Sequence, residues 1–153
     1  MHLADLHRFA IAAKKSTYVG SGAKRDSCRT GSHDLGHELG DWSYLDSYFG
    51  GTDFLGQEVI WFQGQPVWAM NYYGRILRAD LIDASRAADT LRAALAQDGS
   101  EGRLLDNLDW QGPHGAYQIR SSGGITCFKG HETIRCSCVL AYELDYHGGL
   151  MKP

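Results

Sequence analysis

Proline is scarce in this chain, and no long stretch of it is uniformly apolar. The 153 residues include only 3 prolines, against 19 glycines, 8 tyrosines and 4 tryptophans. Few prolines together with abundant glycine and aromatic residues are typical of a sheet-rich fold with tight turns, and argue against a helical bundle. No run of about 18 apolar residues is present, and the first residues lack the pattern of a secretory signal. We therefore expect a soluble, cytoplasmic protein without a membrane partner.

The chain also lacks an excess of positive charge. Its 15 lysines and arginines are outnumbered by 18 aspartates and glutamates, which gives a formal net charge of −3. Because phosphate binding depends on clustered positive charge, we expect no direct binding to nucleic acid. The sequence has no P-loop, no G-x-S-x-G nucleophile elbow and no dinucleotide fingerprint, so no cofactor is expected.

Three groups of residues of the types that bind metal ions do not match known metal-binding motifs. The cysteines Cys28, Cys127, Cys136 and Cys138 contain no C-x-x-C pair, so we expect reduced thiols. The cluster His33-Asp34-Leu35-Gly36-His37-Glu38 is not H-E-x-x-H, and its glycine disfavours the helix that this motif needs. His131 and His147 are expected opposite each other, near Asp145, on a solvated face of the sheet. No metal site is predicted.

The most specific feature is an internal repeat within a chain of single-domain length, 1–153. Shifting the sequence by 74 positions aligns Gly50–Ile60 with Gly124–Ile134, and Trp68–Gly74 with Tyr142–Gly148, without a gap. The identical pairs are Gly50/Gly124, Thr52/Thr126, Phe54/Phe128, Gly56/Gly130, Glu58/Glu132, Ile60/Ile134, Tyr72/Tyr146 and Gly74/Gly148. Identities at one constant offset indicate two pseudo-repeats, about 1–77 and 78–153.

Each repeat is predicted to contain a helix, a strand and a β-hairpin. The predicted elements are helices over 3–15 and 80–97, strands over 42–48 and 115–121, and hairpins over 54–73 and 127–147. Asp80 is expected to cap the second helix and Asp98-Gly99 to end it. The glycine-rich stretch 19–41 shows no period and is expected to be a long, mobile loop. The resulting fold class is α+β: duplicated helix–strand–hairpin units that form an antiparallel sheet, with helices packed on one face.

Strand alternation places one glutamate of each repeat on the apolar face of its hairpin. Side chains two apart share a face, so Glu58 lies with Ile60. The register that brings the apolar sets together puts Glu58 opposite Tyr72, and the same register puts Glu132 opposite Tyr146. Burying an unpaired carboxylate costs several kcal/mol or raises its pKa. Because both repeats contain such a glutamate, we expect the two carboxylates to have a function.

Three interpretations of the two glutamates are open. In the first, each glutamate is structural and bonds its facing tyrosine or nearby backbone. In the second, the glutamates are acceptors in one pocket between the repeats, which suits a cationic or amine-bearing organic ligand. The residues expected to bind that ligand are Glu58, Glu132, Trp68, Tyr72, Tyr142 and Tyr146. In the third, one glutamate of raised pKa acts as a general base or nucleophile.

Several segments together form a specific set of motifs that spans most of the chain. They are Ala13–Tyr18, Ser32–Leu35, Tyr44–Gly51, Phe54–Trp61, Pro66–Gly74 and Tyr142–Gly149. The set resembles a bacterial family of domains of unknown function, the one numbered 5680. Members are often attached behind a helix-turn-helix domain, so the resemblance implies an effector-sensing role for the fused forms and names no catalytic residue. The duplicated pattern also resembles, in architecture only, the gyrase-inhibitor-like effector-binding domains.

The sequence thus predicts a small-molecule-binding domain of the effector-sensing type, with a cationic or amine-bearing ligand. No helix-turn-helix segment is recognised in this chain, which again argues against direct DNA binding. One alternative is a small-molecule hydrolase or isomerase that uses a pocket glutamate as its general base. Another is a protein-interaction module that exposes its aromatic residues on a flat patch. The oligomeric state is left open.

Overall fold

A computed structural model describes residues 1–19, 23–97 and 107–152. The first part of the chain forms α1 (Leu3–Lys14), the π-helical turn η1 (Lys15–Val19), β1 (Ala23–Arg25), β2 (His33–Leu39), β3 (Trp42–Gly50), β4 (Asp53–Phe62) and β5 (Gln65–Ile76). The second part forms α2 (Ala84–Gln97), β6 (Leu108–Gly112), β7 (Gly115–Gly124), β8 (Cys127–Cys136) and β9 (Val139–Leu150).

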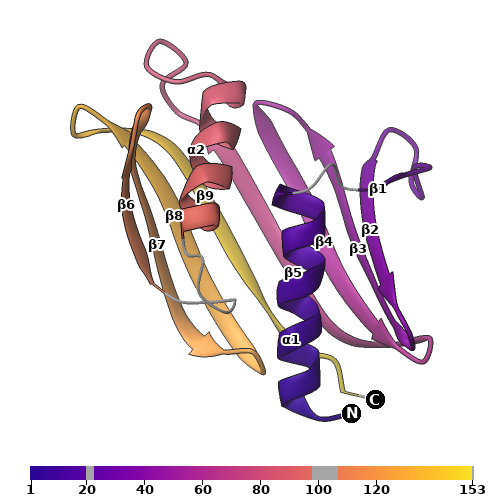
Figure 1. The fold of residues 1–153 in the computed structure, drawn as a ribbon. Coiled ribbons are helices and arrows are strands. Elements are labelled where there is room, and N and C mark those ends of the chain that lie inside the picture. The colour runs from indigo at the N-terminus through magenta and orange to yellow at the C-terminus, as the bar shows by residue number, and fades with distance from the viewer. Residues whose placement is uncertain (20–22, 98–106, 153) are drawn as a thin grey trace.

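All the described strands belong to one antiparallel sheet (Figure 1). Its order is β1-β2-β3-β4-β5-β9-β8-β7-β6, so each part of the chain forms a meander and the two meanders join at β5 and β9. Both expected hairpins are present, as β4–β5 and β8–β9.

The expected α+β class is wrong. More than half of the described residues lie in strands and about a fifth in helices, so one nine-stranded sheet dominates the fold and two short helices accompany it. The sequence predicts one strand and one hairpin for each repeat. The strands β1, β2 and β6 are additional and were not predicted. The additional strands shift the balance from a mixed fold to a sheet-dominated one.

The 74-residue spacing is built into the sheet register. On the central strands, Tyr72 lies directly opposite Tyr146, its counterpart at that spacing. Met70 pairs with Gly148, and Gly74 pairs with Leu144. At the 74-residue spacing, Gly148 is the counterpart of Gly74 and Leu144 is the counterpart of Met70, so the two pairs are equivalent. The central pairing is therefore symmetric about Tyr72 and Tyr146, as expected for two halves related by a pseudo-twofold axis.

The helices are amphipathic and contact the meander of their own half. The buried side of α1 consists of Leu6, Phe9, Ala10 and Ala13, and that of α2 includes Ala87, Thr90 and Ala94. The first helix contacts β2 and β3, and the second contacts β6 and β7 (Figure 1). Among the described residues, no helix is long and apolar enough to cross a membrane.

The cap of α2 differs from the prediction. The Asp83 carboxylate accepts the Arg86 backbone N–H at 2.8 Å, so Asp83 caps the helix. Asp80 forms an ion pair with Arg78 instead. The predicted helix end at Asp98-Gly99 lies outside the described residues.

The stretch 19–41 is not a continuous loop. Val19 ends the π-helical turn, residues 23–25 form β1, and residues 33–39 form β2, whereas residues 20–22 lie outside the described part of the chain. Two of the buried positions on β2 are Asp34 and Gly36. Because neither residue is apolar, the alternation of this strand does not appear as a hydrophobic pattern.

The hairpin register is two residues away from the predicted one. Glu58 lies opposite Met70 rather than Tyr72, and Glu132 opposite Leu144 rather than Tyr146. The cause is a tight turn in each hairpin, at residues 63–64 and 137–138, whose residues all have positive φ, followed by a bulge. A shift of two residues preserves the face, so both glutamates still lie on the apolar side of the sheet.

Candidate functional site

The predicted site residues share the sheet face that the helices cover. Trp68 and Glu58 are completely buried, and Tyr72, Tyr142 and Tyr146 are nearly so. Glu132 is partly buried. Tyr72 and Tyr146 pair with each other at the centre of the sheet. Along the strands, Glu58 lies two residues to one side of this pair and Glu132 lies two residues to the other side.

Glu58 is neutralised by a lysine from α1. The ammonium nitrogen of Lys14 lies 3.0 Å from both Oε1 and Oε2 of Glu58. Asp46 lies directly opposite Glu58 on β3 and is 1% exposed. Two carboxylates therefore face each other in the interior beside one ammonium group, and the Asp46 carboxylate also accepts a 2.6 Å hydrogen bond from Tyr72.

Glu132 has no such ammonium partner. It forms no ion pair with any residue that the structure describes. Burial raises the pKa of the Glu132 carboxyl, and the nearby negative charge of Glu58 adds to the rise, while the hydrogen bond from Tyr117 and the charge of Lys14 oppose it. The two glutamates thus interact electrostatically, and Glu132 is the one whose neutral form the fold favours.

Three tyrosine hydroxyls near the glutamates are buried without a hydrogen bond of ordinary geometry. They belong to Tyr44, Tyr117 and Tyr142, each 1% exposed. Burial raises the pKa of all three, and Glu58 adds to the effect at Tyr44, as Glu132 does at Tyr117 and Tyr142. Tyr44 and Tyr117 lie beside the carboxylates of Glu58 and Glu132, so Tyr142 is the tyrosine of the three whose buried hydroxyl has no partner among the described residues.

Glycines in the repeated motif make room for aromatic rings. A Cβ atom at Gly56 would lie 2.2 Å from the Tyr72 hydroxyl, and a Cβ atom at Gly130 would lie 2.1 Å from the Tyr146 ring. Each tyrosine crosses the neighbouring strand over its glycine and bonds beyond it, Tyr72 to Asp46 and Tyr146 to Ser121. The repeated glycines are therefore explained by packing, without any ligand.

Trp68 is tied to the second half of the sheet. Its indole N–H donates to the Ile125 carbonyl oxygen at 3.1 Å, and its ring stacks on Phe128 with centroids 5.5 Å apart. Its single polar atom is satisfied, so Trp68 can offer a ligand only its apolar surface.

Four residues of this site were not predicted from the sequence: Lys14, Tyr44, Asp46 and Tyr117. Lys14 follows the last apolar residue of the first helical stripe, but helix rotation decides which sheet position it reaches. Tyr44 and Asp46 lie two apart within the predicted strand 42–48, so alternation already places them on one face. Their partners across β3–β4, Ile60 and Glu58, follow from the register.

The histidine clusters are dispersed. On the outer face, His131 pairs with Asp145, not with His147 as expected, and its Nδ1 lies 2.7 Å from the Asp145 carboxylate. On β2, the His37 ring contacts Phe9 and Glu38 binds Arg25. The described part of the chain holds no group of three or more histidine, cysteine or acidic residues that could bind a metal ion.

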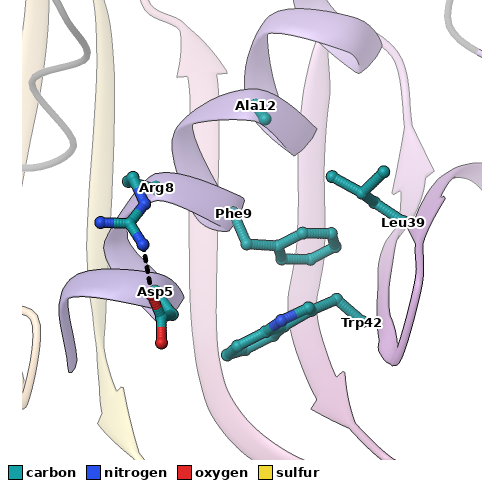
Figure 2. Close-up of a pocket in the computed structure, with 6 residues that line it drawn as sticks. All are labelled: Asp5, Arg8, Phe9, Ala12, Leu39 and Trp42. Carbon is teal, nitrogen blue, oxygen red and sulfur yellow. Dashed lines mark hydrogen bonds and ion pairs between the residues drawn. The ribbon is translucent and has the colours of Figure 1, made fainter. Parts of the chain in front are cut away.

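A hollow of about 350 Å³ lies elsewhere, between α1 and the β2–β3 turn (Figure 2). It is lined by Asp5, Arg8, Phe9, Ala12, Leu39 and Trp42. The Phe9 and Trp42 rings stack with centroids 5.2 Å apart, and the Arg8–Asp5 ion pair lies to one side of them. None of the predicted site residues lines this hollow.

Comparisons with known proteins are limited to one family. Neither the curated proteins nor the solved structures give a match. The family described as "Domain of unknown function (DUF5680)" matches residues 46–151, which include every strand from β4 to β9, both glutamates and Asp46. The chain belongs to this family.

Proposed function

We propose that this protein is a small-molecule-binding domain for a cationic or amine-bearing organic ligand. The ligand would bind on the helix-covered face of the sheet. Its carboxylate partner would be Glu132, since Glu58 already binds Lys14, and its walls would be Trp68, Tyr72, Tyr142 and Tyr146. The observation that carries the proposal is the buried hydroxyl of Tyr142, which has no hydrogen-bond partner among the described residues, because a polar ligand beside Glu132 would give it one.

The charges on this face favour a cation over an anion. Glu58 and Glu132 supply carboxylates, whereas Lys14, which pairs with Glu58, is the one ammonium group that forms an ion pair with either among the described residues. An added cation would offset the remaining negative charge, while the aromatic side chains would contact the apolar part of the ligand. The role we propose is effector sensing in the cytoplasm, as the family resemblance implies.

A second candidate is an enzyme that uses Glu132 as a general base. The raised pKa of Glu132 favours this role, since a carboxylate of higher pKa is the better proton acceptor. A protein-interaction module has less support, because the aromatic residues concerned are buried rather than displayed on a flat patch.

The proposal is tested by measuring thermal stability and heats of binding with benzylamine and with its neutral counterpart, benzyl alcohol. Benzylamine should raise the melting temperature in a concentration-dependent way and benzyl alcohol should not. The same measurements on Glu132→Gln should show weaker binding of benzylamine. If an extended series of organic amines leaves the melting temperature unchanged, the proposal is wrong.

A further inference from the structure

The two halves of the sheet place equivalent groups around the two glutamates. Tyr44 lies opposite Ile60 in the first half, and Tyr117 lies opposite Ile134 in the second. Each of these tyrosines interacts with the glutamate of its own half, Glu58 or Glu132. The fold therefore contains two related carboxylates, which differ in the groups that contact them.

The position in the first half is already occupied by an ammonium group. Lys14 lies 3.0 Å from both oxygens of Glu58, which is completely buried. The aromatic residue opposite Ile60 on β5 is Trp68, whose only polar atom is bonded to Ile125. Lys14 donates a hydrogen bond to Oε1 and lies within ion-pair distance of Oε2, which has no hydrogen-bond partner of its own, so a second ammonium group would compete with the lysine for this carboxylate.

In the second half, no described residue places an ammonium group at Glu132. The described arginines of α2 pair elsewhere, Arg86 with the capping residue Asp83 and Arg92 with Asp89. Tyr142 stands where the first half has Trp68, and its buried hydroxyl has no hydrogen-bond partner. Glu132 is partly buried, whereas Glu58 is completely buried.

We propose that the ammonium group of the ligand binds Glu132, with the hydroxyls of Tyr117 and Tyr142 as further acceptors, and that Lys14 is a built-in ammonium group at the equivalent Glu58. This inference rests on the proposed function and specifies it. Three acceptors around one cation require several N–H donors, and a quaternary ammonium group has none. The ligand class is therefore a primary or secondary organic amine.

The donor requirement is tested by isothermal titration of the full chain with benzylamine, N-methylbenzylamine and benzyltrimethylammonium. The apolar part of these probes is the same and the number of N–H donors falls. We expect the trimethylated probe to bind at least about tenfold more weakly than benzylamine, as for the loss of charge-assisted hydrogen bonds. Equal or tighter binding of the trimethylated probe would overturn the assignment of the hydroxyls as acceptors.

The position is tested with variants. Glu132→Gln should weaken benzylamine binding by about tenfold or more, and Tyr142→Phe should weaken it by less. Lys14→Met should open Glu58 and raise the stoichiometry from one benzylamine per chain to two, and the additional site should vanish in Lys14→Met/Glu58→Gln. If Lys14→Met does not fold, Glu132→Gln and Tyr142→Phe decide the matter, since both leave the Lys14–Glu58 pair intact.

The outcomes separate this inference from the proposed function. If wild type binds benzylamine and Glu132→Gln binds it equally well, the assignment to Glu132 is wrong while the proposed function stands. If a folded Lys14→Met protein keeps a single site of unchanged affinity, the role given to Lys14 is wrong. If wild type binds none of the amines, both proposals fail together.

Discussion

The ammonium nitrogen of Lys14, at the end of α1, lies 3.0 Å from both carboxylate oxygens of Glu58, in the middle of β4. This ion pair spans 44 positions of the sequence and attaches the helix to the sheet. Glu58 is completely buried, whereas the Lys14 side chain is 26% exposed. Each partner would be left in a partly desolvated position if the other were removed.

Replacing Glu58 by glutamine should therefore destabilise the protein. The change keeps the shape of the side chain but leaves Lys14 without its counter-charge, and we expect a loss of about 1–3 kcal/mol in the free energy of unfolding by urea. The matched control is Glu143→Gln, which breaks the ion pair with Arg75 on the outer face. That pair is more exposed, and its loss should cost no more than about 1 kcal/mol. Equal losses for the two variants would contradict the structural importance of the Lys14 contact.

Two tyrosine-to-phenylalanine changes should have different effects on stability. Tyr72→Phe removes a buried 2.6 Å hydrogen bond to Asp46 and should cost about 1.5–3 kcal/mol, because the acceptor is a carboxylate. Tyr142→Phe removes a buried hydroxyl without a partner and should change stability by less than about 0.5 kcal/mol or increase it. Urea unfolding of the two variants in parallel checks the difference. A large loss for Tyr142→Phe in the absence of ligand would mean that its hydroxyl does have a partner in the folded protein.

The stability of the protein should depend on the ionisation of Glu132. Burial raises its pKa in the folded state above the ordinary value of 4.5, so the folded state binds this proton more tightly than the unfolded state does. The corresponding contribution to stability is fully present below about pH 4.5 and is lost as the pH rises through the folded pKa. Glu132→Gln should remove this dependence, so its stability relative to wild type should increase as the pH is raised from 4 to 7.

Unfolding free energies of wild type and Glu132→Gln, measured across this range, test the sign. Among the groups that act on Glu132, Lys14 and His131 lower its pKa and Glu58 raises it, while Tyr117 donates a hydrogen bond to the carboxylate. Because His131 is one of the groups that act on Glu132, the comparison should be repeated in a His131→Gln background. A difference that stays constant with pH, or that falls as the pH rises, would contradict the raised pKa.

The repeated glycine under Tyr146 should not tolerate a side chain. In Gly130→Ala, the new Cβ would lie 2.1 Å from the ring of Tyr146, so the ring would have to leave its place over β8. We expect a loss of about 1–3 kcal/mol, as for other overpacked core positions. Gly124→Ala is the control, because a Cβ there meets nothing within 4 Å and should have little effect on stability. Similar melting temperatures for the two variants would show that the ring can move freely.

Much of the central sheet could be predicted from the sequence. The 74-residue spacing located both hairpins, because turn residues and alternating side chains recur at that offset. Alternation alone placed Glu58 and Glu132 on the apolar face, and a register error of two residues did not change this result. Their actual partners, Met70 and Leu144, depend on the turn conformation at residues 63–64 and 137–138. Each turn contains at least one residue other than glycine that adopts a positive φ, namely Gln63 in the first turn and Ser137 and Cys138 in the second. The sequence pattern does not indicate this conformation.

Other features were decided only by the tertiary structure. The strand β2 was hidden because Asp34 and Gly36 occupy its buried positions, and the Asp34 carboxylate is satisfied there by the Cys28 N–H and the Ser47 hydroxyl. Hydrophobic periodicity cannot detect a strand whose interior contacts are polar. The fold class was wrong for the same reason, since the missed strands changed the balance of the fold.

The duplication, the hairpins and the face on which the two glutamates lie can be predicted from the sequence, because they depend on spacing and on the alternation of side chains along a strand. The difference in ion pairing between Glu58 and Glu132 depends on tertiary packing. Lys14 reaches Glu58 because α1 packs on the first meander with that side chain turned towards β4, and no described residue of α2 does the same for Glu132. The rotation and position of a helix on a sheet result from the packing of its whole buried face, which no local pattern in the sequence contains.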